Sequence, residues 1–273
     1  MVAIIREVMN ALVRPFFFFA AGSLLALATM AGPEPIARDY KASKEVAPLP
    51  SPPSNWTGFY LGLNGGGVFG MKPTVTDVDR FNASSGADRE WSYDTDGFVA
   101  GGQAGYNLQI GKWLVLGAEA DVGYLGVNGS KRQPNNQLFG FDTLAETNPG
   151  IYTTWRARVG VAFNGLMIYA TGGGIGADHE RRIVDDCNIA PCGPDLGSGS
   201  NDDFKVGWTV GGGGEWMLNR RWSFKVEYLY YDLGIDDDVF LTVHSGRDVG
   251  SRSLFHFSED GGHIVRGGIN FHF

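Results

Sequence analysis

The chain contains few cysteines and, after its first thirty residues, no long apolar run. Cysteine occurs only as Cys187 and Cys192, too few and too close together to hold a fold in place. In an exported protein we expect a local disulfide between them, with a free thiol pair as the alternative. A membrane-spanning helix needs about 20 apolar residues, and no stretch after Met30 approaches that length. A helical membrane protein is therefore excluded.

The first thirty residues have the layout of an export signal. Arg6 and Arg14 form a basic start, and an apolar run then extends from Phe16 to Met30, followed by small residues at a spacing suited to signal peptidase. The alternative is a transmembrane anchor, but an apolar run of about 15 residues is too short to span a bilayer. We expect residues 1–31 to be a signal peptide.

Basic residues are in the minority. The chain has 22 Lys+Arg and 30 Asp+Glu, so removing Arg6, Arg14 and Glu7 with the signal leaves 20 and 29, a net charge of −9. This acidic balance argues against nucleic acid as a partner. Residues 32–54 carry six prolines without a period and predict a disordered periplasmic leader. Residues 55–273 remain as the folded part.

Glycine and aromatic residues are abundant, and from residue 56 onward apolar and polar residues alternate. The 41 glycines are about twice the average usage of ~7%, a composition that disfavours helices. Alternation with period two predicts strands with two different faces. Eight segments show it: 57–69, 97–109, 113–125, 151–163, 166–178, 204–216, 222–231 and 265–273.

The connections between these segments alternate in length. Three are hairpin-sized, at 111–112, 164–165 and 219–221, and Asn164-Gly165 is a strong hairpin signal. The other four, near 70–96, 126–150, 179–203 and 236–259, each contain about 20 residues or more and are polar. This asymmetry is typical of outer-membrane barrels. We predict an all-β fold: an eight-stranded antiparallel up-and-down transmembrane β-barrel with short periplasmic turns and long extracellular loops.

One face of the predicted strands is apolar and the other is polar. A soluble barrel such as a lipocalin would place the apolar face inside, and periodicity alone does not distinguish the two. We expect tryptophans near strand ends to form interfacial girdles: Trp56, Trp113, Trp155, Trp208, Trp216 and Trp222. Charged residues recur on the polar face and predict a cluster of ion pairs in a narrow lumen: Glu119, Asp121, Arg156, Arg158, Lys205, Glu215, Lys225, Glu227 and Arg266.

The amino-acid sequences of several predicted strands resemble those of one protein family. Residues 55–62 (NWTGFYLG) resemble the first strand of small outer-membrane β-barrel porin-family surface proteins of alphaproteobacteria. Further similar segments are GAEADVGY (117–124), WRARVGVAF (155–163), KVGWTVGGGGEW (205–216), WSFKVEYLYYDLG (222–234) and VRGGINFHF (265–273). The resemblance implies an outer-membrane location and surface antigens, and it makes Phe273 the signal for the barrel-assembly machinery. Hemin-binding relatives in that family imply hemin as a candidate ligand, without a motif to carry it.

Catalysis is not indicated. Ser253, Ser258 and Glu259 are close in sequence to His256 and His263, but a Ser/His/acid site requires convergence that this spacing does not impose. We therefore predict no enzyme, and no catalytic or cofactor-binding residues.

Two other patterns also have simple structural explanations. Asp236-Asp237-Asp238 offers hard oxygen ligands but lacks the spacing of a calcium loop, so a solvated loop without metal is expected. The glycine runs 172–174 and 211–214 lack the Lys-Ser/Thr of a phosphate loop. Inside strands, glycine permits tight curvature.

These patterns lead to a functional hypothesis with alternatives. The first is a structural, surface-exposed protein of the cell envelope. The alternatives are a narrow porin for ions or small solutes, and a surface protein that binds hemin or another ligand. The expected partners are outer-membrane lipid, the barrel-assembly machinery and, through the loops, hemin or host molecules.

Overall fold

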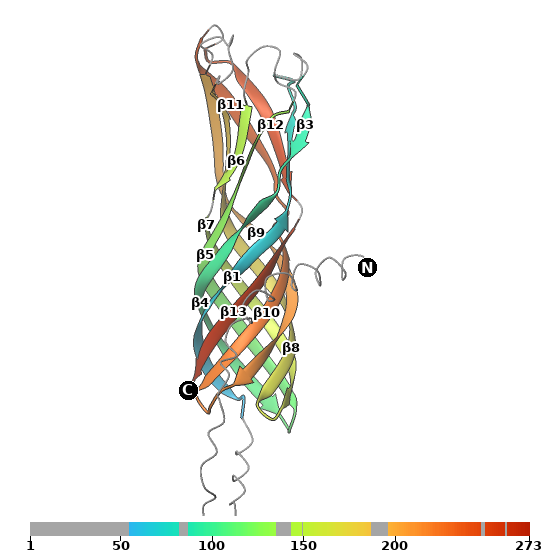
Figure 1. Ribbon diagram of the computed structural model, residues 1–273, viewed down its shortest axis with the longest axis vertical. Coiled ribbons are helices and arrows are strands. Elements are labelled where there is room, and N and C mark those ends of the chain that lie inside the picture. Colours follow the sequence, from blue (N-terminus) through green and yellow to red (C-terminus); the bar gives the residue numbers. More distant parts are fainter. Residues whose placement is uncertain are drawn as a thin grey trace, which may run out of the picture. The chain divides into compact units, whose positions relative to one another are not determined.

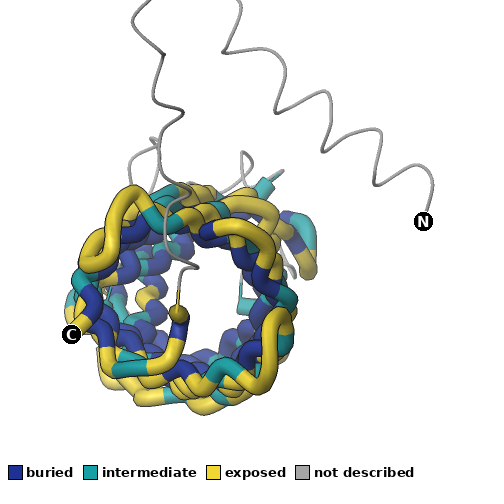
Figure 2. The backbone as a smooth tube through the Cα atoms, turned by 90° about the horizontal axis from the view of Figure 1, so that it is seen from below, coloured by how far each residue is buried: buried dark blue, intermediate teal, exposed yellow. Residues whose placement is uncertain are grey.

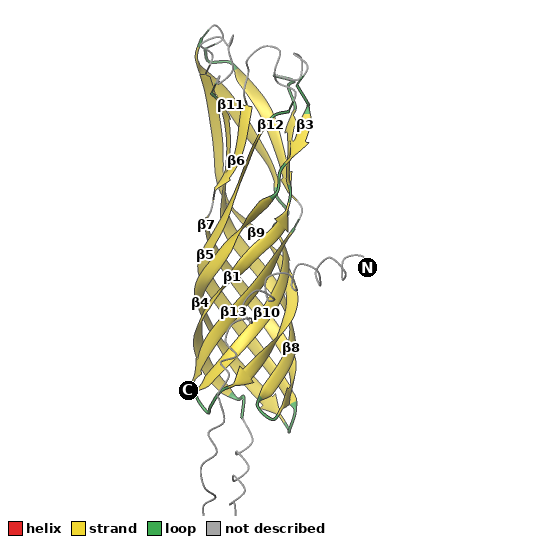
Figure 3. Cartoon of the chain, viewed as in Figure 1, coloured by secondary structure: helices red, strands yellow, loops and turns green. Residues whose placement is uncertain are grey.

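Every regular element of the described residues is a β-strand (Figure 3). The computed structural model describes residues 55–81, 87–134, 143–148, 150–186, 196–246, 249–259 and 261–273. No helix in these ranges is long and apolar enough to cross a membrane. The predicted signal peptide, the predicted leader, Cys187 and Cys192 lie outside the described residues, so these remain predictions.

Eight strands form a closed antiparallel ring (Figures 1 and 2). Each pairs with the next along the chain, and the last pairs with the first, with Leu61 opposite Phe271. Each of these eight strands is therefore paired on both sides within the described residues, as a lipid environment requires. The ring confirms the predicted eight-stranded antiparallel fold. Its strands are β1 (Gly58–Met71), β4 (Thr95–Ile110), β5 (Leu114–Arg132), β7 (Gly150–Phe163), β8 (Leu166–Asp185), β9 (Leu196–Met217), β10 (Trp222–Asp232) and β13 (Gly262–His272).

The short connections are tight turns at one end of the ring. Asn164 and Gly165 both have positive φ, at 44° and 89°, which is the requirement of a two-residue hairpin turn. Strand β1 begins and β13 ends at this same end (Figure 1). The chain therefore enters and leaves the ring beside the short turns.

The long connections differ from the predicted loops. They are largely paired strands, which prolong the sheet beyond the ring: β2 (Pro73–Asp77), β3 (Glu90–Ser92), β6 (Thr143–Asn148), β11 (Asp236–Ser245) and β12 (Arg252–Glu259). Strand β6 pairs with the upper part of β8, while β11 pairs with β9 and β12. We refer to these paired segments as the extension. Their own alternation is visible, since Val239, Leu241 and Val243 are buried between exposed or half-buried neighbours.

The outer face of the ring is apolar, so the faces are oriented as in a membrane barrel and not as in a soluble one. Large apolar side chains are exposed along every ring strand, among them Leu63 at 73% and Trp216 at 62%. Five of the six predicted girdle tryptophans face outward. Trp56 does not: it is 0% exposed, and its ring meets the imidazole of His272 edge-on at 5.9 Å. Trp56 precedes β1 and turns into the mouth of the ring, so its position in the sequence next to a strand end was misleading.

The lumen is filled in layers, and strand β5 passes through three of them. Near the short turns Val115 belongs to an apolar cluster with Trp56, Met167 and Tyr169. Glu119 and Asp121 come next and are buried. Leu125 and Val127 then belong to a second apolar cluster. A third cluster, with Val75, Trp91, Phe255 and Phe257 among its members, fills the extension. The charged layer therefore lies between apolar layers.

Candidate functional site

The charged layer of the lumen is assembled from inward positions of five ring strands, β5, β7, β9, β10 and β13. Eight of the nine predicted cluster residues meet there. Their side chains are between 0% and 2% exposed. Four are acidic and four are basic, so their formal charges cancel. We call them the lumen network: Glu119, Asp121, Arg156, Arg158, Glu215, Lys225, Glu227 and Arg266.

Glu119 lies at the centre of the network. Its carboxylate is 2.5 Å from Arg156 Nη2 and 2.7 Å from Lys225 Nζ. The Tyr60 hydroxyl donates a hydrogen bond to it at 2.6 Å. A carboxylate surrounded by donors in this way is compensated without water.

Two arginines, Arg156 and Arg266, connect the carboxylates of Asp121 and Glu227. Arg156 lies 2.8 Å from Asp121 and 3.1 Å from Glu227. Arg266 contacts the same two acids, with Nη2 2.6 Å from Glu227 and Nη1 3.1 Å from Asp121. Each acid therefore meets two guanidinium groups, and the pairs form one continuous unit across the lumen.

Arg158 joins the network toward the short turns. Its guanidinium carbon lies 4.8 Å from the ring centroid of Tyr60 and 5.1 Å from that of Tyr169. It also donates to Asn107 at 2.9 Å and lies 3.1 Å from Glu215. Cation–π contact in a dry environment holds an arginine without solvent.

Lys205, the ninth predicted residue, lies apart from the network. Its amine is paired with Asp237 of β11, its side chain is 25% exposed, and Asp203 is 3.9 Å away. Lys205 lies ten residues before Glu215 on β9, so its side chain is at the beginning of the extension and not at the level of the network. The sequence predicted correctly which face of β9 carries Lys205, but not its position along the barrel axis.

Neutral polar residues complete the network and were not singled out from the sequence. Asn64 donates to Gln103 at 2.9 Å and to Asp121 at 3.1 Å. Asn270 donates to Glu215 at 2.7 Å. Asn64, Gln103 and Asn270 all occupy inward positions of their strands. Strand alternation therefore already places them in the lumen, where they can bind the charged residues.

Ser223, Glu215 and His272 come together near the short turns. Ser223 Oγ donates to Glu215 at 2.5 Å and lies 2.9 Å from Nε2 of His272. The carboxylate is also 3.5 Å from this same Nε2. A catalytic triad needs the acid on the other ring nitrogen, where it orients the imidazole. All three side chains are buried, so this group is arranged to be structural.

The serines and histidines considered for catalysis do not converge. Ser253 faces inward on β12, whereas His256 faces outward between Asp236 and Asp238, 3.0 Å from each. His263 faces outward from β13 and stacks on Phe69 at 5.5 Å.

The three consecutive aspartates also separate, since Asp237 faces inward and its two neighbours face outward. In the ranges that the structure describes, no group of three His, Cys, Asp or Glu residues is placed to hold a metal ion.

A smaller polar layer lies above the second apolar cluster. Arg181 pairs with Glu259 and donates to Thr147 at 2.7 Å, and the Tyr93 hydroxyl is 2.8 Å from Thr147. Burial raises the pKa of Tyr93.

His179 lies nearby. Its outward neighbours on β8, Asp178 and Glu180, are acidic, which places this part of the strand beyond the apolar belt. His179 is 3% exposed, and burial lowers its pKa to about 3. Neither ring nitrogen has a hydrogen-bond partner among the described residues.

Comparison with known proteins gives a consistent set of matches. Residues 18–249 match the family model described as outer membrane protein beta-barrel domain. The chain is 34% identical over 254 residues to the 31 kDa outer-membrane immunogenic protein of Brucella melitensis, which covers 92% of this chain and 98% of that protein. It is 31% identical over 193 residues to the 22 kDa outer membrane protein of Rhizobium leguminosarum, covering 69% of each. Among solved structures, the outer membrane protein OprG from Pseudomonas aeruginosa aligns with 81% of this chain and 99% of its own, with 12% identity and a TM-score of 0.45.

Proposed function

This chain belongs to the outer membrane protein β-barrel domain family and lies in the outer membrane, and we propose that its barrel is a closed structural and surface-exposed protein, neither a pore nor an enzyme. The observation that supports this is the lumen network, neutral in sum and buried between apolar layers. Side chains that line a water-filled pore are exposed to water, whereas these are at most 2% exposed. An eight-stranded barrel has an interior just wide enough for side chains to fill.

The extension gives the barrel its surface role. The short turns and both ends of the folded part lie on one side of the ring, so in a barrel of this family the extension lies on the cell surface. Its outer face carries polar and charged positions such as Glu90, Glu146 and Asp238. We expect antibodies and host molecules to meet this part of the protein. Two groups of relatives bear the word immunogenic in their names, which supports the same proposal.

Phe273 is the expected contact with the barrel-assembly machinery. It is 75% exposed and follows directly after β13, and its backbone N–H donates to the Phe59 carbonyl at 3.1 Å. An accessible aromatic terminus beside the strand that closes the ring is well placed to guide assembly. Replacing Phe273 with serine should slow insertion of the protein into assembly-machinery proteoliposomes, while Phe163→Ser, at an exposed aromatic that ends β7, provides the control.

Single-channel conductance tests the closed lumen. The mature protein is refolded, folding is verified by the heat-dependent shift on a denaturing gel, and the protein is inserted into a planar bilayer. A silent bilayer is expected. Discrete, reproducible steps would overturn the proposal and favour the narrow porin, especially if Glu119→Gln altered them and Lys205→Gln did not.

Hemin binding rests on the family resemblance alone. A titration followed by the Soret band would show whether the folded protein binds hemin saturably. Saturation at one equivalent would establish ligand capture by the extension as an additional role.

A further inference from the structure

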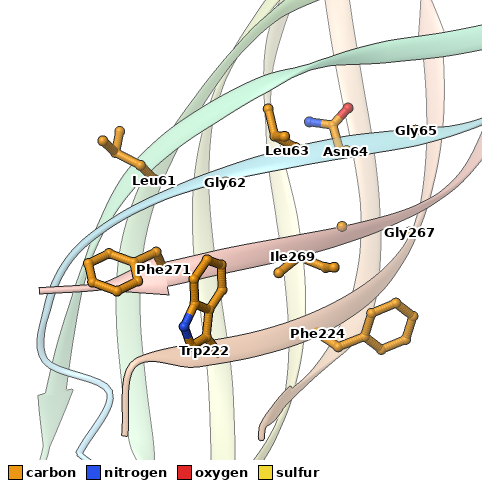
Figure 4. A pocket seen from close by; sticks show the side chains of 11 residues that line it. Leu61, Gly62, Leu63, Asn64, Gly65, Trp222, Phe224, Gly267, Ile269 and Phe271 are labelled. Atoms are coloured by element: carbon orange, nitrogen blue, oxygen red, sulfur yellow. The ribbon is translucent and has the colours of Figure 1, made fainter. Parts of the chain in front are cut away.

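The lipid-facing surface carries an apolar groove along strand β13 (Figure 4). Its volume is about 670 Å³. Leu61 and Leu63 of β1 form one wall, and Trp222 and Phe224 of β10 form the other. The groove therefore lies where the first and last strands of the ring meet.

The upper part of the groove floor is glycine, above Ile269 and Phe271 of β13. Gly65 and Gly267 are paired directly across β1 and β13, and both occupy outward positions. A Cβ atom on Gly267 would meet other atoms only at 3.8 Å or beyond, and one on Gly65 only at 3.6 Å. Neither position needs glycine to avoid a clash, because both have room for a larger side chain. The two glycines therefore leave this part of the surface hollow.

The groove lies in the periplasmic half of the apolar belt. Strand β10 begins with Trp222 at the short-turn end, and β13 passes Phe271 before it ends there. Above the groove the belt continues on the same strands to Phe69 and Tyr228. The groove thus faces the inner leaflet of the outer membrane.

Positive charge marks the lower end of the groove. The turn before Trp222 contains Arg220 and Arg221, both exposed. The carbonyl of Arg221 accepts a hydrogen bond of 2.7 Å from the His272 amide, which fixes this turn against β13 beside Phe271. Across the three short turns, residues 111–112, 164–165 and 218–221, the bases are Lys112 and these two arginines, and there is no acidic residue.

We propose that this groove, with Arg220 and Arg221, binds one anionic glycerophospholipid of the periplasmic leaflet. An acyl chain lies over the glycine floor, and the phosphate meets the guanidinium groups at headgroup level. Guanidinium groups match phosphate oxygens in bidentate geometry. Each arginine near an anionic lipid surface raises affinity by about fivefold. The proposal does not depend on whether the lumen conducts.

Native mass spectrometry provides the test. The refolded mature protein is mixed in detergent with equal amounts of phosphatidylglycerol and phosphatidylcholine of identical chains, and the lipids that stay bound are counted. We expect at least a fivefold preference for phosphatidylglycerol in a single tightly retained adduct. The double variant Arg220→Gln/Arg221→Gln should bring the preference close to one. Gly267→Leu fills the floor and should remove the tight adduct of either lipid.

Two matched variants separate this site from general effects. Lys112→Gln removes a positive charge from a different turn, and Gly214→Leu adds a side chain to an outward glycine of β9, where the nearest neighbour of a Cβ is 4.0 Å away. Both should retain the preference, with folding confirmed by the gel shift. Equal retention of the two lipids by the parent protein, or equal losses in these two controls, would overturn the proposal. So would a dimer that disappears in Gly267→Leu without any lipid preference, since a second copy would then occupy the groove.

Discussion

Removing one charge from the centre of the lumen network is the sharpest perturbation the structure offers. Glu119→Gln keeps nearly the same volume and can still accept the hydrogen bond from Tyr60. It leaves four buried cations with three carboxylates. Lys225 loses its carboxylate partner at 2.7 Å, and its remaining carboxylate is Glu227 at 3.9 Å.

The expected cost follows from burial. Breaking a buried ion pair by removing one partner costs ~3–5 kcal/mol, because the remaining charge is left without compensation. Arg156 keeps two carboxylates, at 2.8 and 3.1 Å, so we expect the lower part of that range, about 3 kcal/mol. The pair of Lys205 with Asp237 is partly exposed, and partly solvated pairs contribute less. Lys205→Gln should therefore cost about 1 kcal/mol or less.

Urea unfolding of the refolded protein in detergent, followed by tryptophan fluorescence and the gel shift, measures these differences. A second variant examines the cause. Glu119→Gln/Lys225→Met removes the cation that lost its partner, restores neutrality, and should recover more than half of the lost stability. Such coupling between contacting residues is what a double-mutant cycle detects.

Two results would refute this reasoning. One is a Glu119→Gln protein within about 1 kcal/mol of the parent, the loss expected of an exposed pair. The other is a double variant whose loss equals the sum of the two single losses. Either would mean that water enters the charged layer, and the closed-lumen proposal would fail with it.

Three further predictions concern the mouth of the ring, its wall and the upper part of β8. Trp56→Ala should cost ~3–5 kcal/mol in the same urea titration because it empties a fully buried site; unchanged stability would contradict the burial of this side chain in the mouth of the ring. Gly66→Ala should prevent most of the protein from folding on the gel-shift assay, since a Cβ there would lie 2.1 Å from the Val265 carbonyl, whereas Gly65→Ala should fold normally. The pKa of His179, about 3 when folded, lies below the ordinary ~6.5. The unfolded chain therefore takes up the proton first, and stability should fall by about 2 kcal/mol between pH 7.5 and pH 5. His179→Leu should remove that pH dependence, and an unchanged slope would contradict it.

Strand alternation and connection length were sufficient to predict the ring from sequence. The inward and outward faces of Glu119, Arg156 and Arg266 follow from period two once the apolar face is assigned to lipid. Which acid meets which base does not follow, because pairing across the lumen depends on shear and on the height of each strand. Lys205 illustrates this, since it has the same alternation as Glu215 but lies ten residues higher.

The extension escaped prediction for a different reason. Its strands are short, from three to ten residues in β2, β3, β6, β11 and β12, and polar residues such as the aspartates of 236–238 resemble a solvated loop. Their inward members, Val239 and Phe255 for example, are apolar, but the alternation is too brief to stand out. The burial of Trp56 could not be predicted either, because its neighbours in the sequence do not distinguish a tryptophan inside the mouth of the ring from one in the interfacial girdle.

Because the extension is built from paired strands, its antigenic surface is discontinuous. Neighbouring positions such as Glu146 of β6 and Arg182 of β8 come from segments more than thirty residues apart and are brought together by strand register. An antibody raised against the folded protein would recognise residues from several strands at once. Linear peptides copied from any single connection would reproduce little of that surface, so an immunogen based on this protein has to preserve the barrel that holds the strands in register.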